Sequence, residues 1–178
     1  MARKNPSAQS YNTPVLYRQA EESDLDAICA LIRAAVRAME ARGIFQWDGI
    51  YPARADFLAD IQKRQLSVGT VGGDIVVVYA VNDECDAEYR NGTWRCPDGG
   101  FRVIHRLCVH PAYWNRGIAK SALARIEREL QDAKVGSVRL DVFGGNPAAL
   151  SLYLHAGYKI VGFADWRMGR FHLMEKLL

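Results

Sequence analysis

The sequence predicts a single α/β domain of about seven strands and about four helices. Short apolar stretches with period-two alternation recur along the chain, and segments with helically spaced apolar residues separate them. One apolar stretch, 103–109, leads through a short turn into a helix at Gly117. A chain of 178 residues can bury a substantial core in one domain, which we expect at residues 15–178.

The N-terminal half predicts the order strand, helix, helix, strand, strand. Acidic residues at 21–24 begin the first helix, which runs to about residue 41 before Gly43 ends it. Pro52 begins the second helix, with Phe57, Leu58 and Ile61 on one face. The expected strands are 16–20, 66–71 and 75–81.

The C-terminal half alternates helices with strands. We expect a helix from Gly117 to about Lys134 and a strand at 137–143. Asn146 is a favoured helix N-cap and Pro147 a favoured first residue, so they begin a helix that Gly157 ends. The last two expected strands are 158–163 and 170–177.

Composition is that of a globular protein, with 49% hydrophobic and 24% charged residues. The net charge of +3 is mild and spread along the chain, so we expect no nucleic-acid partner. No run of about 18 apolar residues is present, and we expect no membrane span. Residues 1–14 predict a flexible tail, and no apolar secretion signal precedes the domain, so we expect a cytoplasmic protein.

Cysteine usage predicts free thiols in a cytoplasmic protein. The four cysteines, Cys29, Cys85, Cys96 and Cys108, have no C-x-x-C spacing. If the protein were oxidised, a disulfide between Cys85 and Cys96 would be the plausible one. A zinc site from these two and a distant histidine is a minor alternative, and we expect no metal.

The turn 114–119 has the features of an anion site. A helix start leaves about four backbone N–H groups without partners and carries partial positive charge, which suits a phosphate or pyrophosphate. Gly117 lets the backbone approach an anion, Ala119 adds almost no bulk, and Arg116 contributes charge nearby. An ATP-binding phosphate loop does not fit, because Trp114 stands where that loop needs glycine.

This stretch resembles the acyl-CoA-binding core of the GNAT N-acetyltransferases. Their usual pattern is Gln/Arg-x-x-Gly-x-Gly/Ala, after a strand that ends in a hydrophobic triplet and often His-Pro. Here the triplet is 107–109, His110-Pro111 follows, and the pattern occupies 114–119. Trp114 departs from the pattern at its first position, which affects a side-chain contact and leaves the backbone cradle intact.

The helix after Asn146 resembles the second signature of the same family. That signature is a strand, an asparagine, a helix containing Leu-Tyr, Gly-aromatic and a strand; here it reads Asn146, Leu152-Tyr153 and Gly157-Tyr158. Asn146 and Tyr153 are seven residues apart, two helical turns, and lie near one face. The resemblance implies that Asn146 bonds the pantetheine arm and that Tyr153 protonates the leaving thiolate. A helix cap and a packing aromatic are the alternatives.

The resemblance, which covers roughly Val15 to the C-terminus, implies the GNAT fold and its chemistry. The fold is a mixed, mostly antiparallel seven-stranded sheet flanked by about four helices, with two central parallel strands splayed apart for pantetheine. The function is acetyl transfer from acetyl-CoA to a primary amine, by direct attack in a ternary complex. The implied cofactor-binding residues are Leu107, Cys108, Val109, Trp114, Asn115, Arg116, Gly117, Ile118, Ala119, Lys120, Asn146 and Tyr153.

The chemistry needs an oxyanion donor and a base. The resemblance implies a backbone N–H of the cofactor strand, here at Val109, as the donor. His105 is the candidate base, because an unperturbed histidine has a pKa near 6.5; a packed strand residue or a water chain are the alternatives. Cys108 alternates away from His105 along the strand, so we do not expect it to carry the acyl group.

Two segments have no clear pattern. The segment 43–52 carries three aromatic residues, and Gln46, Trp47 and Tyr51 are our candidates for contact with the acceptor. Alternatively, Phe45 and Trp47 fill the core. The segment 82–100 is long for a hairpin connection and predicts a solvated loop, with a lid or a dimer contact as alternatives.

Two rival functions remain. A catalytically silent acyl-CoA-binding module would keep the anion site without turnover. A nucleic-acid-binding module would show salt-sensitive affinity, against which the absence of a basic cluster argues. The acceptor stays open between small molecules and peptides, and a homodimer is common in the family.

Overall fold

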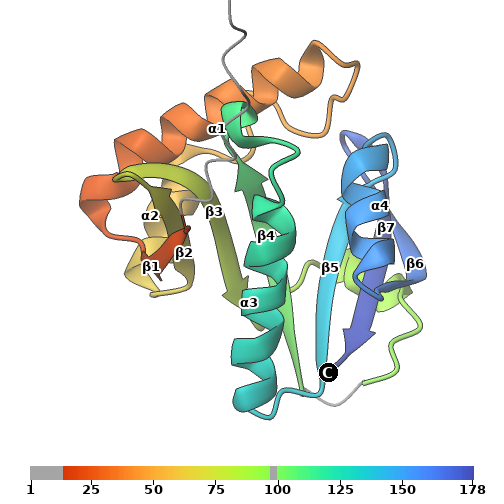
Figure 1. Ribbon diagram of the computed structural model, residues 1–178. Helices are drawn as coiled ribbons and strands as arrows, with labels where there is room; N and C mark the ends of the chain where they lie inside the picture. Colours follow the sequence, from red (N-terminus) through yellow and green to blue (C-terminus); the bar gives the residue numbers. More distant parts are fainter. Residues whose placement is uncertain (1–13, 97–99) are drawn as a thin grey trace, which may run out of the picture.

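The computed structural model describes residues 14–96 and 100–178, which form one seven-stranded sheet with helices on both faces (Figure 1). The flexible tail expected at 1–14 lies, except for Pro14, outside the described residues. The strand order is β1-β2-β3-β4-β5-β7-β6. The strands are β1 (Leu16–Gln19), β2 (Leu66–Val71), β3 (Asp74–Asn82), β4 (Phe101–Val109), β5 (Ser137–Phe143), β6 (Lys159–Trp166) and β7 (Gly169–Leu177).

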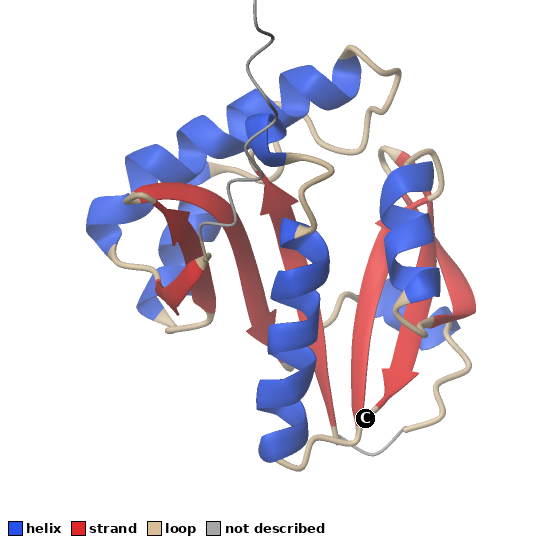
Figure 2. Cartoon of the chain, in the orientation of Figure 1, coloured by secondary structure: helices blue, strands red, loops and turns tan. Residues whose placement is uncertain are grey.

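Four α-helices cover the sheet, so the predicted fold class is confirmed (Figure 2). They are α1 (Leu25–Glu40), α2 (Arg54–Gln62), α3 (Ile118–Asp132) and α4 (Pro147–His155). The expected start of the second helix at Pro52 is wrong by two residues. The Asp56 side chain accepts a hydrogen bond from the Ala53 backbone N–H at 2.7 Å, which sets the first turn after Ala53.

The sheet is antiparallel except for the pairing of β4 with β5. These two parallel strands pair only at Phe101–Ser137, Arg102–Val138 and Val103–Arg139. Beyond Val103 they diverge, as Figure 1 shows at the centre of the molecule. We call this divergence the split; it divides the sheet into β1–β4 on one side and β5–β7 on the other.

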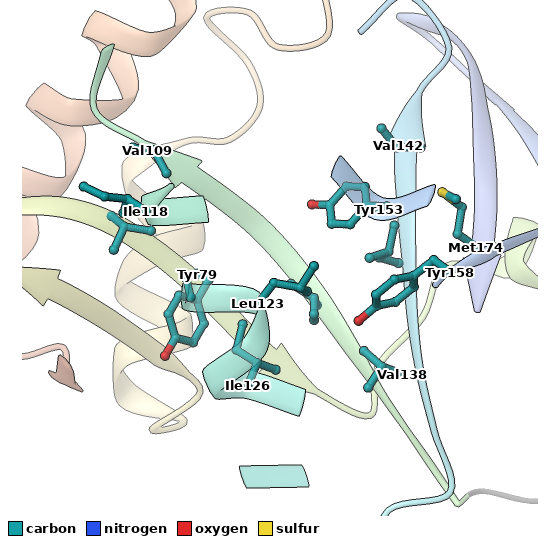
Figure 3. Packing of buried hydrophobic residues seen from close by; sticks show 14 of the residues in the cluster. Tyr79, Val109, Ile118, Leu123, Ile126, Val138, Val142, Tyr153, Tyr158 and Met174 are labelled. Carbon is teal, nitrogen blue, oxygen red and sulfur yellow. The ribbon is translucent and has the colours of Figure 1, made fainter. Parts of the chain in front are cut away.

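The larger core lies between the sheet and α3 and α4 (Figure 3). Along α3, Ile118, Ala122, Leu123 and Ile126 are buried, and their i, i+4, i+5 and i+8 spacing places them on one helix face. Leu123 and Ile126 pack with Val138 and Leu140 of β5 and with Tyr158. Each such fully buried side chain stabilises the fold by about 1.5–3 kcal/mol. This core fixes α3 beside the split.

A second core fills the opposite face of β1–β4. Helix α1 contributes the buried Ile28, Leu31 and Ile32, and α2 contributes Phe57. Cys108 of β4 belongs to this core. Because α1 is anchored here along its length, its C-terminal end and the segment that follows it lie over the split.

Residues 82–96 of the segment 82–100 pack against β5–β7, so this part is not the solvated loop that we expected. It contains a 3₁₀ turn, η2 (Ala87–Asn91), whose Tyr89 is buried with Val103, Ala164 and Leu173 in a third core. Trp94 stacks on Tyr89, and its indole N–H donates to the Tyr89 carbonyl at 2.7 Å. The sequence showed the polar residues of this segment but not the sheet face beneath it.

A buried charged pair ties the same segment to the sheet. The Arg139 guanidinium lies over the rings of Trp94, at 4.1 Å, and Phe101, at 3.7 Å. Glu175 lies 3.8 Å from it and also accepts the backbone N–H groups of Arg95, at 2.8 Å, and Cys96, at 3.3 Å. Satisfied hydrogen bonds of this kind are what make a buried carboxylate tolerable.

We predict that Gly162→Ala destabilises the protein. A Cβ at Gly162 would lie 2.6 Å from the Asn91 carbonyl oxygen and 2.9 Å from the Gly92 Cα, so η2 must move off β6. Overpacking of this kind costs about 1–3 kcal/mol of unfolding free energy, which urea denaturation measures. Gly49→Ala is the matched control, because its Cβ would meet no atom within 4 Å. Equal stability of the two variants would contradict the packing.

Candidate active site

A cavity of about 630 Å³ opens at the split. Its walls come from the end of α1, the segment 43–52, the second half of β4, the start of α3, β5, α4 and the β6–β7 turn. Eleven of the twelve predicted cofactor-binding residues line this cavity, as do the predicted acceptor residues Gln46, Trp47 and Tyr51 and the candidate base His105. Arg116 does not line it; its guanidinium lies over the Tyr113 ring at 5.1 Å.

The N-terminus of α3 presents free backbone amides to the cavity. Gly117 is the N-cap with a left-handed φ of 77°, and the first bond into the helix runs from the Ser121 N–H to the Gly117 carbonyl at 2.9 Å. The N–H groups of Ile118, Ala119 and Lys120 come before that bond and have no carbonyl within the helix to bond. A Cβ at Gly117 would meet no protein atom within 4 Å, so the space beside the cap is open.

Trp114 holds the cofactor strand in place. Its indole N–H donates to the Val109 carbonyl at 2.7 Å, and the Arg42 guanidinium lies over its ring at 4.5 Å. The departure from the family pattern at this position therefore exchanges a polar side chain for a fixed indole and brings Arg42 to the cavity wall. Sequence reasoning missed Arg42, because its contact with Trp114 exists only in the tertiary structure.

The Val109 backbone N–H faces the split. Along an antiparallel strand, successive residues direct their amide and carbonyl groups to opposite sides. The His110 N–H donates to the Val76 carbonyl on β3 at 2.8 Å. The amide and carbonyl of Val109 therefore point away from β3, toward the space that β5 has left, where the carbonyl accepts the Trp114 indole N–H.

Asn146 caps α4 and also reaches across the cavity. Its Oδ1 accepts the Ala149 N–H at 3.1 Å, so the helix cap that we considered as an alternative is present. Its Nδ2 donates to the Gln46 Oε1 at 2.7 Å, which links α4 to the segment 43–52. An amide nitrogen carries two N–H groups, so a second donor remains.

Tyr153 is buried and neutral. Its ring packs edge-on against Tyr158 at 5.7 Å, and its hydroxyl points toward β4 (Figure 3). Burial raises the pKa of the Tyr153 phenol well above its usual range, and the nearby Asp141 and Cys108 add to the rise. The side chain is therefore a phenol that can donate a proton at neutral pH.

His105 is held through one ring nitrogen. Its Nε2 lies 2.9 Å from the Asn82 Oδ1 and 3.1 Å from the Glu84 carbonyl. Asn82 is oriented by its own bonds, since its Nδ2 donates to Gln65 and its Oδ1 accepts the Glu84 N–H. Both partners of Nε2 are acceptors, so Nε2 carries the proton and the lone pair of neutral His105 lies on Nδ1. Burial lowers the pKa of this histidine.

A bulge in β4 corrects our argument about Cys108. Arg106 has a φ of 55°, and the register with β3 moves from Ala80–His105 to Val78–Cys108, one extra residue on β4. Cys108 therefore shares a face with His105 instead of alternating away from it. The thiol is nevertheless a poor nucleophile, because burial raises the pKa of Cys108 to about 12.

The segment 43–52 divides between the cavity and the core. Trp47 packs against the α1–α2 core, so the core interpretation is confirmed for it; it also lines the cavity, and its contact with the acceptor stays a prediction. Phe45 is 55% exposed, and the expectation that it fills the core is wrong. The Arg106 guanidinium lies over the Tyr51 ring at 5.3 Å and forms an ion pair with Asp60.

Sequence reasoning also missed a carboxylate in the cavity wall. Asp141 of β5 lines the cavity and accepts the Tyr89 hydroxyl at 2.9 Å on Oδ1. Burial raises the pKa of the Asp141 carboxyl to about 6. Asp141 lies in the strand expected at 137–143, but nothing in that stretch of sequence indicates that the neighbouring strand diverges.

The described residues, 14–96 and 100–178, contain neither a candidate metal site nor a candidate membrane-spanning helix. No group of three or more His, Cys, Asp or Glu side chains is arranged to hold a metal ion. Over the same described residues, no helix has the length and apolar character to cross a membrane. All four cysteines are free thiols.

Comparison with known proteins gives the same assignment from sequence and from fold. The profile described as "Acetyltransferase (GNAT) family" matches residues 68–158. The N-alpha-acetyltransferase RimI of Mycobacterium tuberculosis is 45% identical over 60 residues, which are 33% of this chain and 35% of that protein. The chain thus matches about a third of the length of this curated relative.

Solved structures match nearly the whole fold. A GNAT-family acetyltransferase from Streptococcus agalactiae has a TM-score of 0.81 at 24% identity, covering 92% of this chain and 95% of that one. The PaiA N-acetyltransferase from Thermoplasma acidophilum, solved in complex with coenzyme A, has a TM-score of 0.71 at 17% identity, covering 93% and 99%.

The profile match spans half of the chain, from β2 to the end of α4, and includes the α3 N-terminus, Asn146 and Tyr153. The solved structures extend the likeness to both ends of the sheet. The family match over half of the chain and the shared fold together show that this chain belongs to the GNAT acetyltransferases.

Proposed function

We propose that this enzyme transfers an acetyl group from acetyl-CoA to a primary amine by direct attack in a ternary complex. One observation supports this above the others: the free amides at the start of α3 and the inward-facing Val109 N–H border the same cavity. The first group suits a diphosphate and the second a developing oxyanion. A thioester carrier of the length of coenzyme A would engage both.

The diphosphate would bind at the α3 N-terminus. Free N–H groups and the helix dipole favour an anion there, and the left-handed Gly117 leaves its space open. Lys120 and Arg42 line the same part of the cavity and add full positive charges. Arg42 thus takes over a contact that the family pattern assigns to the position of Trp114.

The pantetheine arm would lie along the split. The polar groups of β4 beyond Val103 have no parallel partner on β5, so an amide-bearing chain can bond them in its place. Asn146 offers its second amide N–H from the opposite wall. The family implies this contact for Asn146, and its place in the cavity supports it.

The reacting carbonyl and sulfur would lie between Val109 and Tyr153. The Val109 N–H stabilises the negative charge that develops on the carbonyl oxygen. Tyr153, kept as a phenol by burial, gives its proton to the departing thiolate. Because Cys108 stays protonated, the thiolate that would form an acyl-cysteine intermediate is missing. This supports direct attack by the amine.

The acceptor would enter beside the segment 43–52, where Gln46, Trp47 and Tyr51 line the cavity. RimI of M. tuberculosis is named as an N-alpha-acetyltransferase. A peptide with a free α-amino terminus is therefore our first test acceptor, together with spermidine and lysine methyl ester. Release of the coenzyme A thiol with any of them distinguishes an active transferase from a silent acyl-CoA-binding module.

Gly117→Glu should abolish coenzyme A binding, because its carboxylate would occupy the anion site and oppose the diphosphate. We expect a loss of at least about 100-fold in affinity by calorimetry. Gly117→Ala is the matched control, since it has the same unfavourable backbone at a φ of 77° without the charge. We expect it to cost about 1 kcal/mol of stability and to keep binding. Retained binding in the Glu variant would rule out this cradle.

Tyr153→Phe should lower kcat by about 100-fold and leave the dissociation constant of coenzyme A within about twofold. The change removes the proton donor and keeps the packing against Tyr158. Turnover is measured by thiol release and affinity by calorimetry. Unchanged turnover would remove the proton-donor role from this residue.

Cys108 should remain unacetylated when the protein is incubated with acetyl-CoA alone, since its thiol stays protonated at pH 8. A thiol reagent at that pH should modify the exposed Cys85, which serves as the internal control. Peptide mass spectrometry measures both sites. An acetyl group on Cys108 would contradict direct attack.

A further inference from the structure

The alternation of side chains along β4 and β5 places one polar side chain on each side of the split, on the same face of the sheet. Val103 and Arg139 are the last paired residues of β4 and β5. Side chains two residues further along each strand lie on the same face as these. Those residues are His105 and Asp141, so they lie on the same side of the sheet, the side that η2 covers, with the split between them.

Asp141 is positioned by one bond and has capacity for another. The Tyr89 hydroxyl donates to its Oδ1 at 2.9 Å. No lysine or arginine of residues 14–96 and 100–178 forms an ion pair with it. The side chain is half-buried and borders the cavity, where a carboxylate has up to about four acceptor positions.

The titratable groups around Asp141 come from every neighbouring element. Asp86, before η2, raises the pKa of the Asp141 carboxyl, and Arg106 of β4 lowers it. Tyr51, from the segment 43–52, and Tyr153 of α4 are close enough for Asp141 to raise the pKa of each phenol. On β7 the cross-strand partner is Leu173, which is apolar.

The charges of the cavity are unevenly distributed. Arg106 and Arg167 line it, but each pairs with a carboxylate outside the lining, Asp60 and Asp48. The remaining cations, Arg42 and Lys120, belong to the end of α1 and the start of α3, where the diphosphate is proposed to bind. Asp86 and Asp141 are the acidic residues of the lining. The acceptor side therefore suits a cationic amine.

We propose that Asp141 is the catalytic base, which takes a proton from the ammonium group of the acceptor, and that Tyr89 positions its carboxylate for this step. This inference rests on the function proposed above and deepens it. On this proposal, η2 serves to position Tyr89. The packing of η2 against β6 and in the third core holds the Tyr89 hydroxyl over β5, where it bonds Asp141.

The step begins with a proton transfer from the acceptor to Asp141. An N–H bond of the ammonium group breaks, its proton moves to Asp141, and the electron pair stays on nitrogen. The amine attacks the thioester carbonyl, a C–N bond forms, and the C–S bond breaks. The thiolate takes the proton of Tyr153, which recovers one from the acylated nitrogen. Asp141 releases its proton to water when the products leave.

Geometry favours Asp141 over His105 for this step. The proton of His105 lies on Nε2, which is occupied by Asn82 and Glu84, so only Nδ1 can accept a proton. Burial makes His105 a weaker base and Asp141 a stronger one, with a pKa of about 6. Asp141 is thus ionised at pH 7 and loses its function as the pH falls through about 6.

Asp141→Asn is the decisive variant, because its amide oxygen can still accept the Tyr89 hydroxyl but cannot take a proton. We expect kcat with the test acceptors to fall about 100-fold, the acidic limb of the pH–rate profile to disappear, and coenzyme A affinity to stay within about twofold. Asp165→Asn, an exposed carboxylate on β6 paired with Arg170, is the matched control and should behave as wild type. Turnover of Asp141→Asn within about threefold of wild type, or an intact acidic limb, would overturn the proposal.

Two further variants separate the roles. The His105→Ala variant should keep the acidic limb of the pH–rate profile. If this variant loses the acidic limb, the base is His105 and the proposal is overturned. Tyr89→Phe removes a bond that favours the ionised carboxylate, so the limb should move up by about one pH unit. An unmoved limb would remove the positioning role of Tyr89.

A last measurement does not depend on turnover. In ¹³C-labelled protein, the carboxyl resonance of Asp141, assigned by its loss in Asp141→Asn, is titrated with and without n-butylammonium chloride. Binding of the ammonium beside the carboxylate should lower the apparent pKa by at least about half a unit. An unmoved midpoint would overturn the proposal. If wild-type protein acetylates none of the test acceptors, that failure counts against the proposed function alone.

Discussion

The parting of β4 and β5 after Val103–Arg139 is the constraint on which the site depends. Two parallel strands normally satisfy each other's backbone groups, and here each leaves a row of them facing open space. Such groups need a partner, and a chain with amides of its own can supply one. The same parting directs the Val109 N–H into the cavity and lets side chains from both strands approach a substrate from opposite walls.

Packing on both faces of the sheet holds the split open. On one face, α3 and α4 share a core that includes residues of β4 and β5, so neither helix can close over the space. On the other face, residues 82–96 are fixed by Arg139 and Glu175, a buried charged pair whose guanidinium lies over the rings of Trp94 and Phe101. Trp114 then pins the last peptide of β4. The cavity thus lies between three separate hydrophobic cores: the α3–α4 core, the α1–α2 core and the core around Tyr89.

Local patterns predicted one half of the site and missed the other. Gly117, Asn146 and the helix that carries Tyr153 follow from cap and turn chemistry, which depends on a few neighbouring residues. Arg42, Tyr89 and Asp141 reach the cavity only through contacts distant in sequence: Tyr89 and Asp141 are joined by a bond across 52 positions. The bulge at Arg106 also escaped prediction, since it is stabilised by the register with β3.

By itself, the sequence determined which segments are strands and helices, and where a helix start with free amides follows an apolar strand. These features are local, because hydrophobic period, caps and turns act over one or two turns of chain. The tertiary structure alone decided that β4 and β5 separate after three pairs, that residues 82–96 pack on the sheet, and that Asp141 faces the cavity. These features depend on how side chains from segments distant in the sequence pack against one another. No short stretch of sequence contains that information.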